Sequence, residues 1–246
     1  MTPALQRQES PAALHAALAL IVTGILCPIA GAQYVWTGAA SLNWNNPLNW
    51  RPNQVPGVDI PGANAVVQSA DGMINVTNWI TLGNLETGTS VRFWGIQATL
   101  GSASTRDLIL ENASVICAGS MELSGNTQWN WGAVQGGGEM LNLDTLTIPT
   151  TAQPRNLGKP LRNVSFVDQN GSMTLIAGGS IVNQGTWDVS GAGINFDASA
   201  TGGFLNQATF IKSGAFTCDI SVGFTSEAAS ELKVDGGWLR LHRTGA

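Results

Sequence analysis

Three aspartates in the second half of the chain have the residue type and spacing for acid–base chemistry. Asp188, Asp197 and Asp219 recur about once per turn if the chain coils with the period of its repeats, which would align them on one face. Hydrolysis of a glycosidic bond needs two carboxylates facing each other across the substrate, and a lyase needs a carboxylate cluster for calcium with a basic residue nearby. Solvated polar positions explain the aspartates as well. We favour that interpretation and keep the three as candidates for an acidic face.

Other groups that carry chemistry are sparse. His242 is the only histidine that follows the amino-terminal segment, and it lies close to the carboxyl end. The Gly136–Glu139 stretch lacks the Lys-Ser/Thr pair of a phosphate-binding loop and is better explained as a sharp corner between strands. No Cys/His spacing indicates a metal site. We therefore predict no catalytic, metal-binding or cofactor-binding residue, and we leave enzymatic activity open.

Trp36, Trp44 and Trp50 lie close together near the start of the chain. Exposed aromatic rings can pack on sugar faces, so the three tryptophans are candidates for carbohydrate contact. Large aromatic side chains also bury enough area to hold a small unit together. With Pro and Val residues between them, we favour a small packed core that caps the open end of a coil.

The composition favours an all-β protein and argues against nucleic acid as a partner. Charged residues make up only 11% of the 246 residues, and 30 residues are glycine. Many turns and a neutral polar exterior account for both numbers. The net charge is −5 and the few lysines are scattered, whereas surfaces that bind nucleic acid carry clustered Lys and Arg.

Residues 1–32 carry the pattern of a signal peptide. The apolar run Ala12–Ile29 is followed by Ala30-Gly31-Ala32, which suits signal peptidase. A transmembrane anchor is the alternative, because the run approaches the length that spans a bilayer, but Pro28 and the small residues favour cleavage. We expect export to the cell surface or medium, a mature chain that begins at Gln33, and membrane contact only through this signal.

Removal of the signal leaves two cysteines. Cys117 and Cys218 are 101 positions apart (218 minus 117). In a coil that rises by about 4.8 Å per turn, their Cα atoms would be too distant for a disulfide. We expect two buried free thiols.

A repeat organises the stretch from residue 179 to 237. Ile181–Trp187 (IVNQGTW) returns as Phe204–Phe210 (FLNQATF), with the Asn-Gln pairs 23 positions apart (206 minus 183). A third copy, Leu232–Leu239, keeps only the order of a small residue followed by an aromatic one. Short β-rich repeats of this period predict a β-solenoid, here of about seven to nine turns.

The repeat also predicts which side chains meet. Trp187 should lie in line with Phe210 as the inward aromatic residue of its turn. Asn183 should lie above Asn206, since stacked asparagines can bond to one another and to the backbone of turns.

Two features depart from the regular coil. The repeat sets Val189 opposite Lys212, and a buried unpaired lysine is costly, so we expect either a bulge after Phe210 or a solvent-facing side here. The proline-rich segment from Thr150 to Pro160 is expected to form a loop without strands that projects from the stack.

The strings IVNQGTW, FLNQATFIKSG and LKVDGGWLRL resemble the repeats of right-handed parallel β-helices in autotransporter-passenger-like secreted bacterial proteins. The W-T-G…W…N-W…V-P spacing from Tyr34 to Val67 resembles the module that precedes the helix in such proteins. The resemblance implies a Trp-rich cap at 33–70 and a right-handed parallel β-helix at 71–246. It also implies a chain truncated at its carboxyl end, because no barrel, sorting tail or capping unit follows.

We expect an exported structural or adhesin-like surface protein without catalytic activity of its own. Its partners would be surface carbohydrate or other cell-surface components. The alternative is a polysaccharide-active enzyme or a carbohydrate-binding module on the same fold. A groove with several carboxylates, or a carboxylate pair with Arg or Lys, would favour the enzyme, and a bland Thr/Asn/Ser face would favour the rod.

Overall fold

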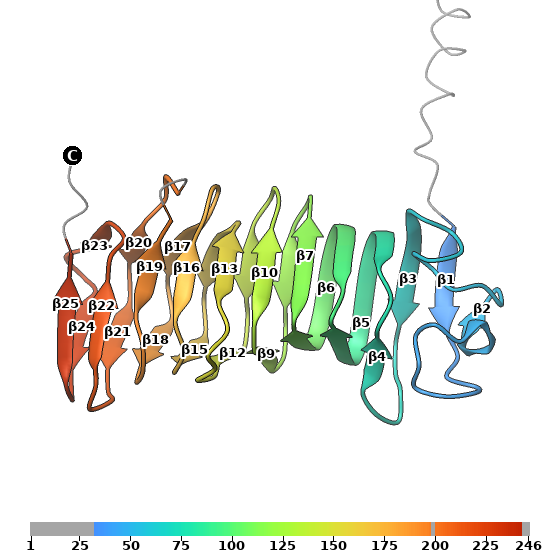
Figure 1. Ribbon diagram of the computed structural model, residues 1–246, viewed down its shortest axis with the longest axis horizontal. Helices are drawn as coiled ribbons and strands as arrows, with labels where there is room; N and C mark the ends of the chain where they lie inside the picture. The colour runs from blue at the N-terminus through green and yellow to red at the C-terminus, as the bar shows by residue number, and fades with distance from the viewer. Residues whose placement is uncertain (1–31, 198–199, 243–246) are drawn as a thin grey trace, which may run out of the picture. The chain divides into compact units, whose positions relative to one another are not determined.

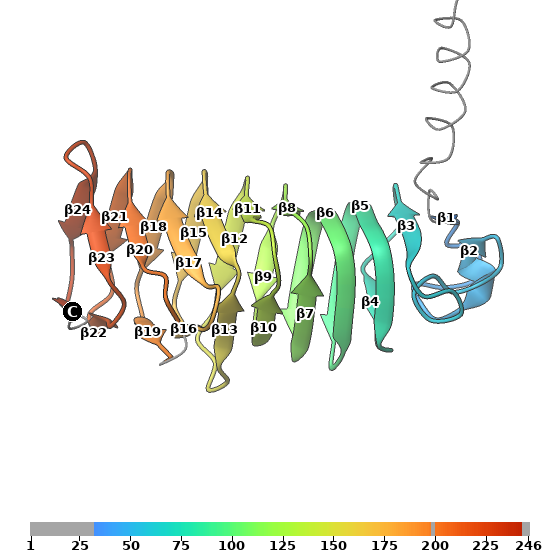
Figure 2. The ribbon, with the colours of Figure 1, turned by 90° about the horizontal axis from the view of Figure 1, so that it is seen from above.

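The computed structural model describes residues 32–197 and 200–242, and it is an all-β parallel solenoid of about nine turns. Figures 1 and 2 show the turns stacked side by side from β1 to β25. Within the described residues the only helical element is a 3-10 turn, Pro47–Asn49, and no helix is long and apolar enough to cross a bilayer. The predicted signal peptide falls outside the described residues except for Ala32. The predicted fold class is confirmed.

The strands of successive turns form three faces. Within a turn, as in β5, the chain runs through the third face, then the first and then the second. The first face contains β1 (Gln33–Trp36), β3 (Ala63–Val67), the middle of β5 (Ile80–Trp94) and of β6 (Gln97–Glu111), β8 (Met121–Leu123), β11 (Met140–Asn142), β14 (Pro160–Asn163), β17 (Ser180–Asn183), β20 (Phe204–Asn206) and β23 (Phe224–Ser226). The second face contains β4 (Ile74–Val76), the ends of β5 and β6, β9 (Thr127–Trp129), β12 (Thr145–Ile148), β15 (Phe166–Gln169), β18 (Thr186–Val189), β21 (Thr209–Lys212) and β24 (Glu231–Val234). The third face contains the starts of β5 and β6, β7 (Ala113–Cys117), β10 (Gly132–Gln135), β13 (Arg155–Gly158), β16 (Met173–Leu175), β19 (Ile194–Phe196), β22 (Thr217–Ile220) and β25 (Trp238–Leu241).

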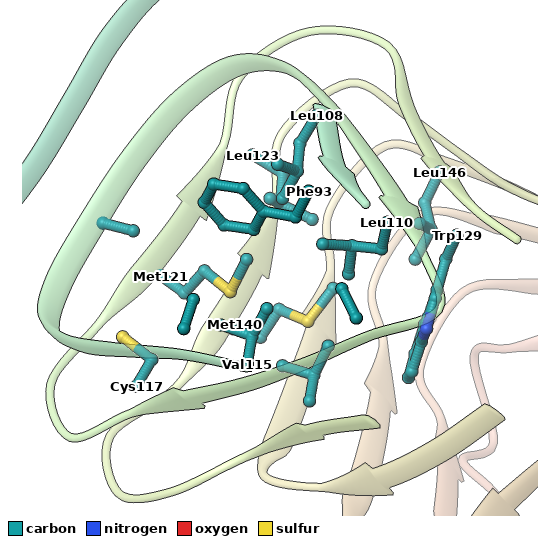
Figure 3. Close-up of a cluster of buried hydrophobic side chains, with 14 of the residues drawn as sticks. Phe93, Leu108, Leu110, Val115, Cys117, Met121, Leu123, Trp129, Met140 and Leu146 are labelled. Carbon is teal, nitrogen blue, oxygen red and sulfur yellow. The ribbon is translucent and has the colours of Figure 1, made fainter. Parts of the chain in front are cut away.

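Alternate side chains of these strands fill the interior, because successive residues of a strand point to opposite sides of the sheet. Figure 3 shows such a section of the core, with side chains from Phe93, Leu108, Leu110, Val115, Cys117, Met121, Leu123, Trp129, Met140 and Leu146. Trp187 pairs with Phe210 in the parallel ladder and both are fully buried, so the predicted alignment of the two repeats is confirmed. Phe204 on β20 packs against both, with its ring centroid 5.1 Å from Trp187 and 5.4 Å from Phe210.

A ladder of buried asparagines runs along the inside of the first face. The predicted stacking of Asn183 on Asn206 is confirmed, and the ladder extends back through Asn163 to Asn142. The Nδ2 of each of the first three asparagines donates to the Oδ1 of the next at 2.7–2.8 Å, and the Nδ2 of Asn206 donates to the hydroxyl of Ser226 at 3.3 Å. Each also donates to a backbone carbonyl of the following turn at 2.9–3.1 Å. The ladder therefore gives the buried amide groups hydrogen-bond partners and joins the corners of successive turns.

The ladder begins at Asn142 because the preceding turn has no asparagine at this position. The residue below it is Leu123, which offers no amide, and the Oδ1 of Asn142 has no partner within the described residues. Leu123 nevertheless fits the same buried position, so the site accepts a leucine-shaped side chain.

Lys212 is buried opposite Val189 without a bulge between their strands, so neither predicted way of avoiding burial applies. Its Nζ instead donates to the carbonyl of Gly214, two residues along the chain. The turn after β21 supplies the acceptor that the repeat alone did not reveal. Burial of the amine is therefore compensated by a backbone dipole.

The prediction of a strandless loop from Thr150 to Pro160 is wrong in its second half. Only Thr150–Pro154 and Lys159 lie outside the strands, because β13 covers Arg155–Gly158 and β14 begins at Pro160. Proline is tolerated at the first residue of a strand, where its missing N–H removes no central ladder bond. Proline density alone therefore overestimated the length of the loop.

The Trp-rich segment is continuous with the coil. The described residues form one compact unit, and β1 pairs in parallel with β3, which pairs with β5. The short strand β2 (Trp50–Arg51) adds an antiparallel edge to β1. The segment therefore supplies the first strand of the first face and also covers that end of the coil.

Both cysteines are free and buried, as predicted. Burial raises the pKa of the Cys117 thiol and raises that of Cys218 from 9.0 to about 11. A folded-state pKa above the unfolded-state value means that the contribution of the thiol to stability is complete below pH 9.0 and is lost as the pH rises toward 11.

The free energy of unfolding should therefore fall between pH 9 and pH 11 by about 2 kcal/mol more in the native protein than in Cys218→Ala. Urea titrations of both proteins at several pH values measure the difference. The Cys117 thiol and the lysines contribute to both proteins and cancel in the comparison. Parallel curves for the two proteins would show that this thiol does not titrate as stated.

Candidate functional site

Exposed aromatic side chains gather at one corner of the solenoid. Trp79, Trp94, Phe216 and Trp238 are 73%, 52%, 75% and 72% exposed. All four lie where the chain passes from a second-face strand to a third-face strand, and we call this edge the aromatic corner. Large exposed aromatic side chains that recur at one edge mark a contact surface more often than isolated ones do.

Trp79 and Trp131 bound a groove of about 450 Å³ at this corner, which we call the tryptophan groove. The third-face ladder runs from Ile80 through two intervening strands to Val134. Trp79 directly precedes Ile80, and Trp131 lies just before Val134, so the two indoles stand three turns apart. At about 4.8 Å per turn, this separation along the axis is roughly 14 Å.

Small residues make the floor of the tryptophan groove. Gly95, Ala113 and Gly132 come from three consecutive turns. A Cβ on Gly132 would lie 2.0 Å from the carbonyl oxygen of Ala113, so only glycine allows the turns to approach here. Asn112 adopts the left-handed conformation (φ 54°), which asparagine tolerates better than most residues, and it contributes to the lining.

The polar lining of the groove is neutral. It consists of side-chain amides and a hydroxyl from Gln97, Asn112, Ser114, Gln153 and Asn156. No ionisable side chain is among the described residues that line it. Such a surface can bind an uncharged ligand by stacking on the indoles and by exchanging hydrogen bonds with the amides, which both donate and accept.

A second groove of about 400 Å³ lies further along the same corner, and we call it the phenylalanine groove. Phe216 bounds it, and Thr151, Ser172 and Ser190 contribute to its lining. The Thr150–Pro154 loop borders both grooves, with Thr150 and Thr151 in the second and Gln153 and Pro154 in the first.

The side chain of Arg155 holds this loop. The buried guanidinium donates to the carbonyl of Trp129 at 2.8 Å, to the carbonyl of Ser172 at 3.1 Å and to the hydroxyl of Thr151 at 2.9 Å. It also donates to the carbonyl of Pro149. Burial lowers the pKa of Arg155, and no carboxylate within the described residues forms an ion pair with it. Backbone carbonyls therefore compensate the buried charge and fix the boundary between the two grooves.

Lys159 is a second buried cation close to β13. Its Nζ donates to the carbonyls of Cys117 at 3.1 Å and Gly119 at 2.6 Å, and also to that of Gly137. Burial lowers its pKa. The amine joins the corners of three consecutive turns between the third and first faces and lines neither groove.

The three predicted aspartates do not share one face. Asp188 lies on the second-face strand β18 and accepts a hydrogen bond from Ser213 at 2.5 Å. Asp219 lies on the third-face strand β22, and its Oδ1 is 2.8 Å from the Nε2 of His242. Asp197 follows the third-face strand β19 and is exposed. None of them lines either groove, and the described residues hold no group of three or more His, Cys, Asp or Glu side chains arranged for a metal ion.

Trp36, Trp44 and Trp50 are buried against one another. The ring centroid of Trp50 lies 5.0 Å from that of Trp36 and 4.5 Å from that of Trp44. Trp50 donates its indole N–H to the carbonyl of Trp44 at 2.8 Å, and Trp44 donates to Pro56 at 3.2 Å. The burial of these rings matches the packed-core alternative, and Trp36, which is 6% exposed, also borders a hollow of about 380 Å³.

Trp79 and Trp131 were not among the predicted site residues, although the sequence around Trp131 carries a signal. Trp129-Asn130-Trp131 places two tryptophans at alternate positions before a turn. Trp129 is fully buried, while the chain turns at Trp131 and leaves that ring partly exposed at the corner. Comparisons with protein-family models, with curated proteins and with solved structures found no match for this chain.

Proposed function

We propose that this chain is an exported, adhesin-like surface solenoid of the autotransporter-passenger-like kind, and that it acts by binding rather than by catalysis. The observation that carries the proposal is the tryptophan groove, a 450 Å³ hollow with two aromatic side walls and a neutral polar lining. A site for binding needs such apolar platforms with a few convergent polar groups. A hydrolase or lyase needs carboxylates or a basic residue in contact with the substrate.

A rigid scaffold supports this function. The asparagine ladder holds the corners between the first and second faces in register, and the buried guanidinium of Arg155 holds the loop that borders both grooves. Grooves built on such a scaffold are formed before a ligand arrives, so binding loses little conformational entropy. A stiff coil also presents its corner over many turns, which suits attachment to an extended surface.

The enzyme alternative has less support among the described residues. Asp168 and Asp188 are neighbours in the second-face ladder, and Asp219 contacts His242 on the third face. Neither pair lines the tryptophan groove or the phenylalanine groove. Carboxylates outside a groove cannot flank a substrate that the groove holds.

The proposal is tested by measuring adhesion and catalysis together. Beads coated with the full chain should adhere to at least some of a set of surfaces coated with polysaccharide, mucin or matrix protein. The same protein should release neither reducing ends nor unsaturated sugars from the polysaccharides. Product release in proportion to the amount of protein would establish the enzyme alternative, and failure to adhere to every surface would refute the adhesive function. Amino-terminal sequencing of the exported protein tests cleavage before Gln33.

A further inference from the structure

We infer that the tryptophan groove binds an uncharged polysaccharide chain that lies along the axis of the solenoid, an assignment that rests on the proposed binding function and names the ligand of its site. Three properties of the groove lead to this class of ligand: the direction in which it runs, the chemistry of its lining and the exposure of its aromatic walls.

The direction of the groove calls for an elongated ligand. Trp79 and Trp131 stand three turns apart, roughly 14 Å at about 4.8 Å per turn. The small floor residues Gly95, Ala113 and Gly132 follow one another from turn to turn between them. A ligand that touches both indoles must therefore run parallel to the axis and cross several turns. A linear chain of sugar rings has this shape, whereas a single small molecule does not reach both walls.

The lining selects for hydroxyl groups without charge. Gln97, Asn112, Gln153 and Asn156 offer amides that both donate and accept, and Ser114 offers a hydroxyl. Sugar hydroxyls also donate and accept, so each can find a partner here. A lipid chain would leave the amides without partners, and a nucleic acid needs cations that the described lining does not contain.

The walls supply stacking platforms. The Trp79 side chain is 73% exposed, so one large apolar ring remains free for the C–H face of a pyranose. Trp94 lies at the same corner, but its ring is covered by the guanidinium of Arg92, 5.1 Å from the ring centroid. Trp94 therefore offers a smaller platform, and the inference depends on Trp79 and Trp131.

Trp79→Ala is the decisive variant because the exposed ring contributes little to folding. Trp238→Ala is its matched control, since Trp238 is 72% exposed at the same corner but lines neither groove. The full chain and both variants are run in native gels containing hydroxyethyl cellulose, galactomannan or xyloglucan, with polygalacturonate and gelatin as the anionic and protein comparisons. Circular dichroism of each variant checks that the fold is intact.

At least one uncharged polysaccharide should retard the native protein and Trp238→Ala equally, and the retardation should persist in high salt. Trp79→Ala should weaken the affinity at least tenfold. The assignment would be overturned if the two variants behaved equally. It would also be overturned if only polygalacturonate retarded the protein and salt abolished the effect, or if only gelatin retarded it. If none of the three uncharged polysaccharides retards the protein, the assignment also fails. In all these cases, adhesion of coated beads would leave the proposed function standing with a different ligand or surface.

Discussion

Asn183→Leu is expected to lower the free energy of unfolding by about 3 kcal/mol, even though leucine has nearly the same shape as asparagine. The substitution removes the acceptor for the amide of Asn163 and the donor to the Oδ1 of Asn206, at 2.8 Å each. It also removes the bond to the carbonyl of Thr209 at 2.9 Å. All these groups are enclosed by the coil, so water cannot replace the lost partner.

Leu123 occupies the corresponding position in the turn before the ladder begins, which shows that the coil can hold a leucine at such a position. The expected loss therefore reports hydrogen bonding rather than shape. Asn142→Leu is the matched control, because the Oδ1 of Asn142 already lacks a partner within the described residues. It should cost about 1 kcal/mol less than Asn183→Leu in urea unfolding. Equal and small losses at both positions would mean that the ladder contributes little to stability.

Arg155→Met is expected to cost about 3 kcal/mol or more, because it leaves several buried acceptors without a donor. The carbonyls of Trp129 and Ser172 lose bonds of 2.8 Å and 3.1 Å, and the hydroxyl of Thr151 loses one of 2.9 Å. Methionine fills much of the aliphatic volume but cannot donate. The effect should therefore combine global destabilisation with release of the Thr150–Pro154 loop.

Hydrogen exchange separates these two effects. The amide of Gly132, which donates to the carbonyl of Pro154 at 3.1 Å, should lose protection in Arg155→Met, while the amides of the distant strand β3 should change only by the global difference. Arg155→Lys is the control, since one ammonium group keeps the charge but cannot reach all four acceptors, and it should fall between the native protein and Arg155→Met. If protection of the Gly132 amide changed only by the global difference in Arg155→Met, this side chain would not hold the border of both grooves.

Much of the coil could be predicted from the repeat. The two Asn-Gln segments lie in adjacent turns, with Asn183 paired to Asn206 and Trp187 paired to Phe210. The prediction succeeded because a solenoid stacks equivalent residues of successive turns, so similarity along the sequence becomes contact in space. The low charge and the abundance of glycine follow from the same arrangement.

The third copy of the repeat was misaligned. The sequence offered Gly237-Trp238 as the counterpart of the small and aromatic residues in the first two copies, but the structure pairs Phe210 with Leu232 and leaves Trp238 exposed on β25. A small residue followed by an aromatic one occurs both inside a strand and at a corner. Two residues carry too little information to distinguish the two settings.

The candidate site shows the same division. The sequence allowed Trp36, Trp44 and Trp50 to be either a sugar-binding platform or a packed core. It did not predict Trp79 and Trp131 as site residues. Residue type was the same in all five, and only the path of the chain around each corner decided which rings were buried. Likewise, the spacing of the three aspartates allowed one acidic face, but turns of unequal length place Asp188 and Asp219 on different faces.

The sequence by itself determined the period, the class of fold, the inward aromatic pair and the stacked asparagines, because each depends on neighbours that recur at a constant distance along the chain. The tertiary structure decided the interior place of Lys212 and Arg155 and the groove between Trp79 and Trp131. These features depend on carbonyls and rings contributed by different turns at corners of irregular length. Contacts of that kind leave no periodic trace in the order of the residues.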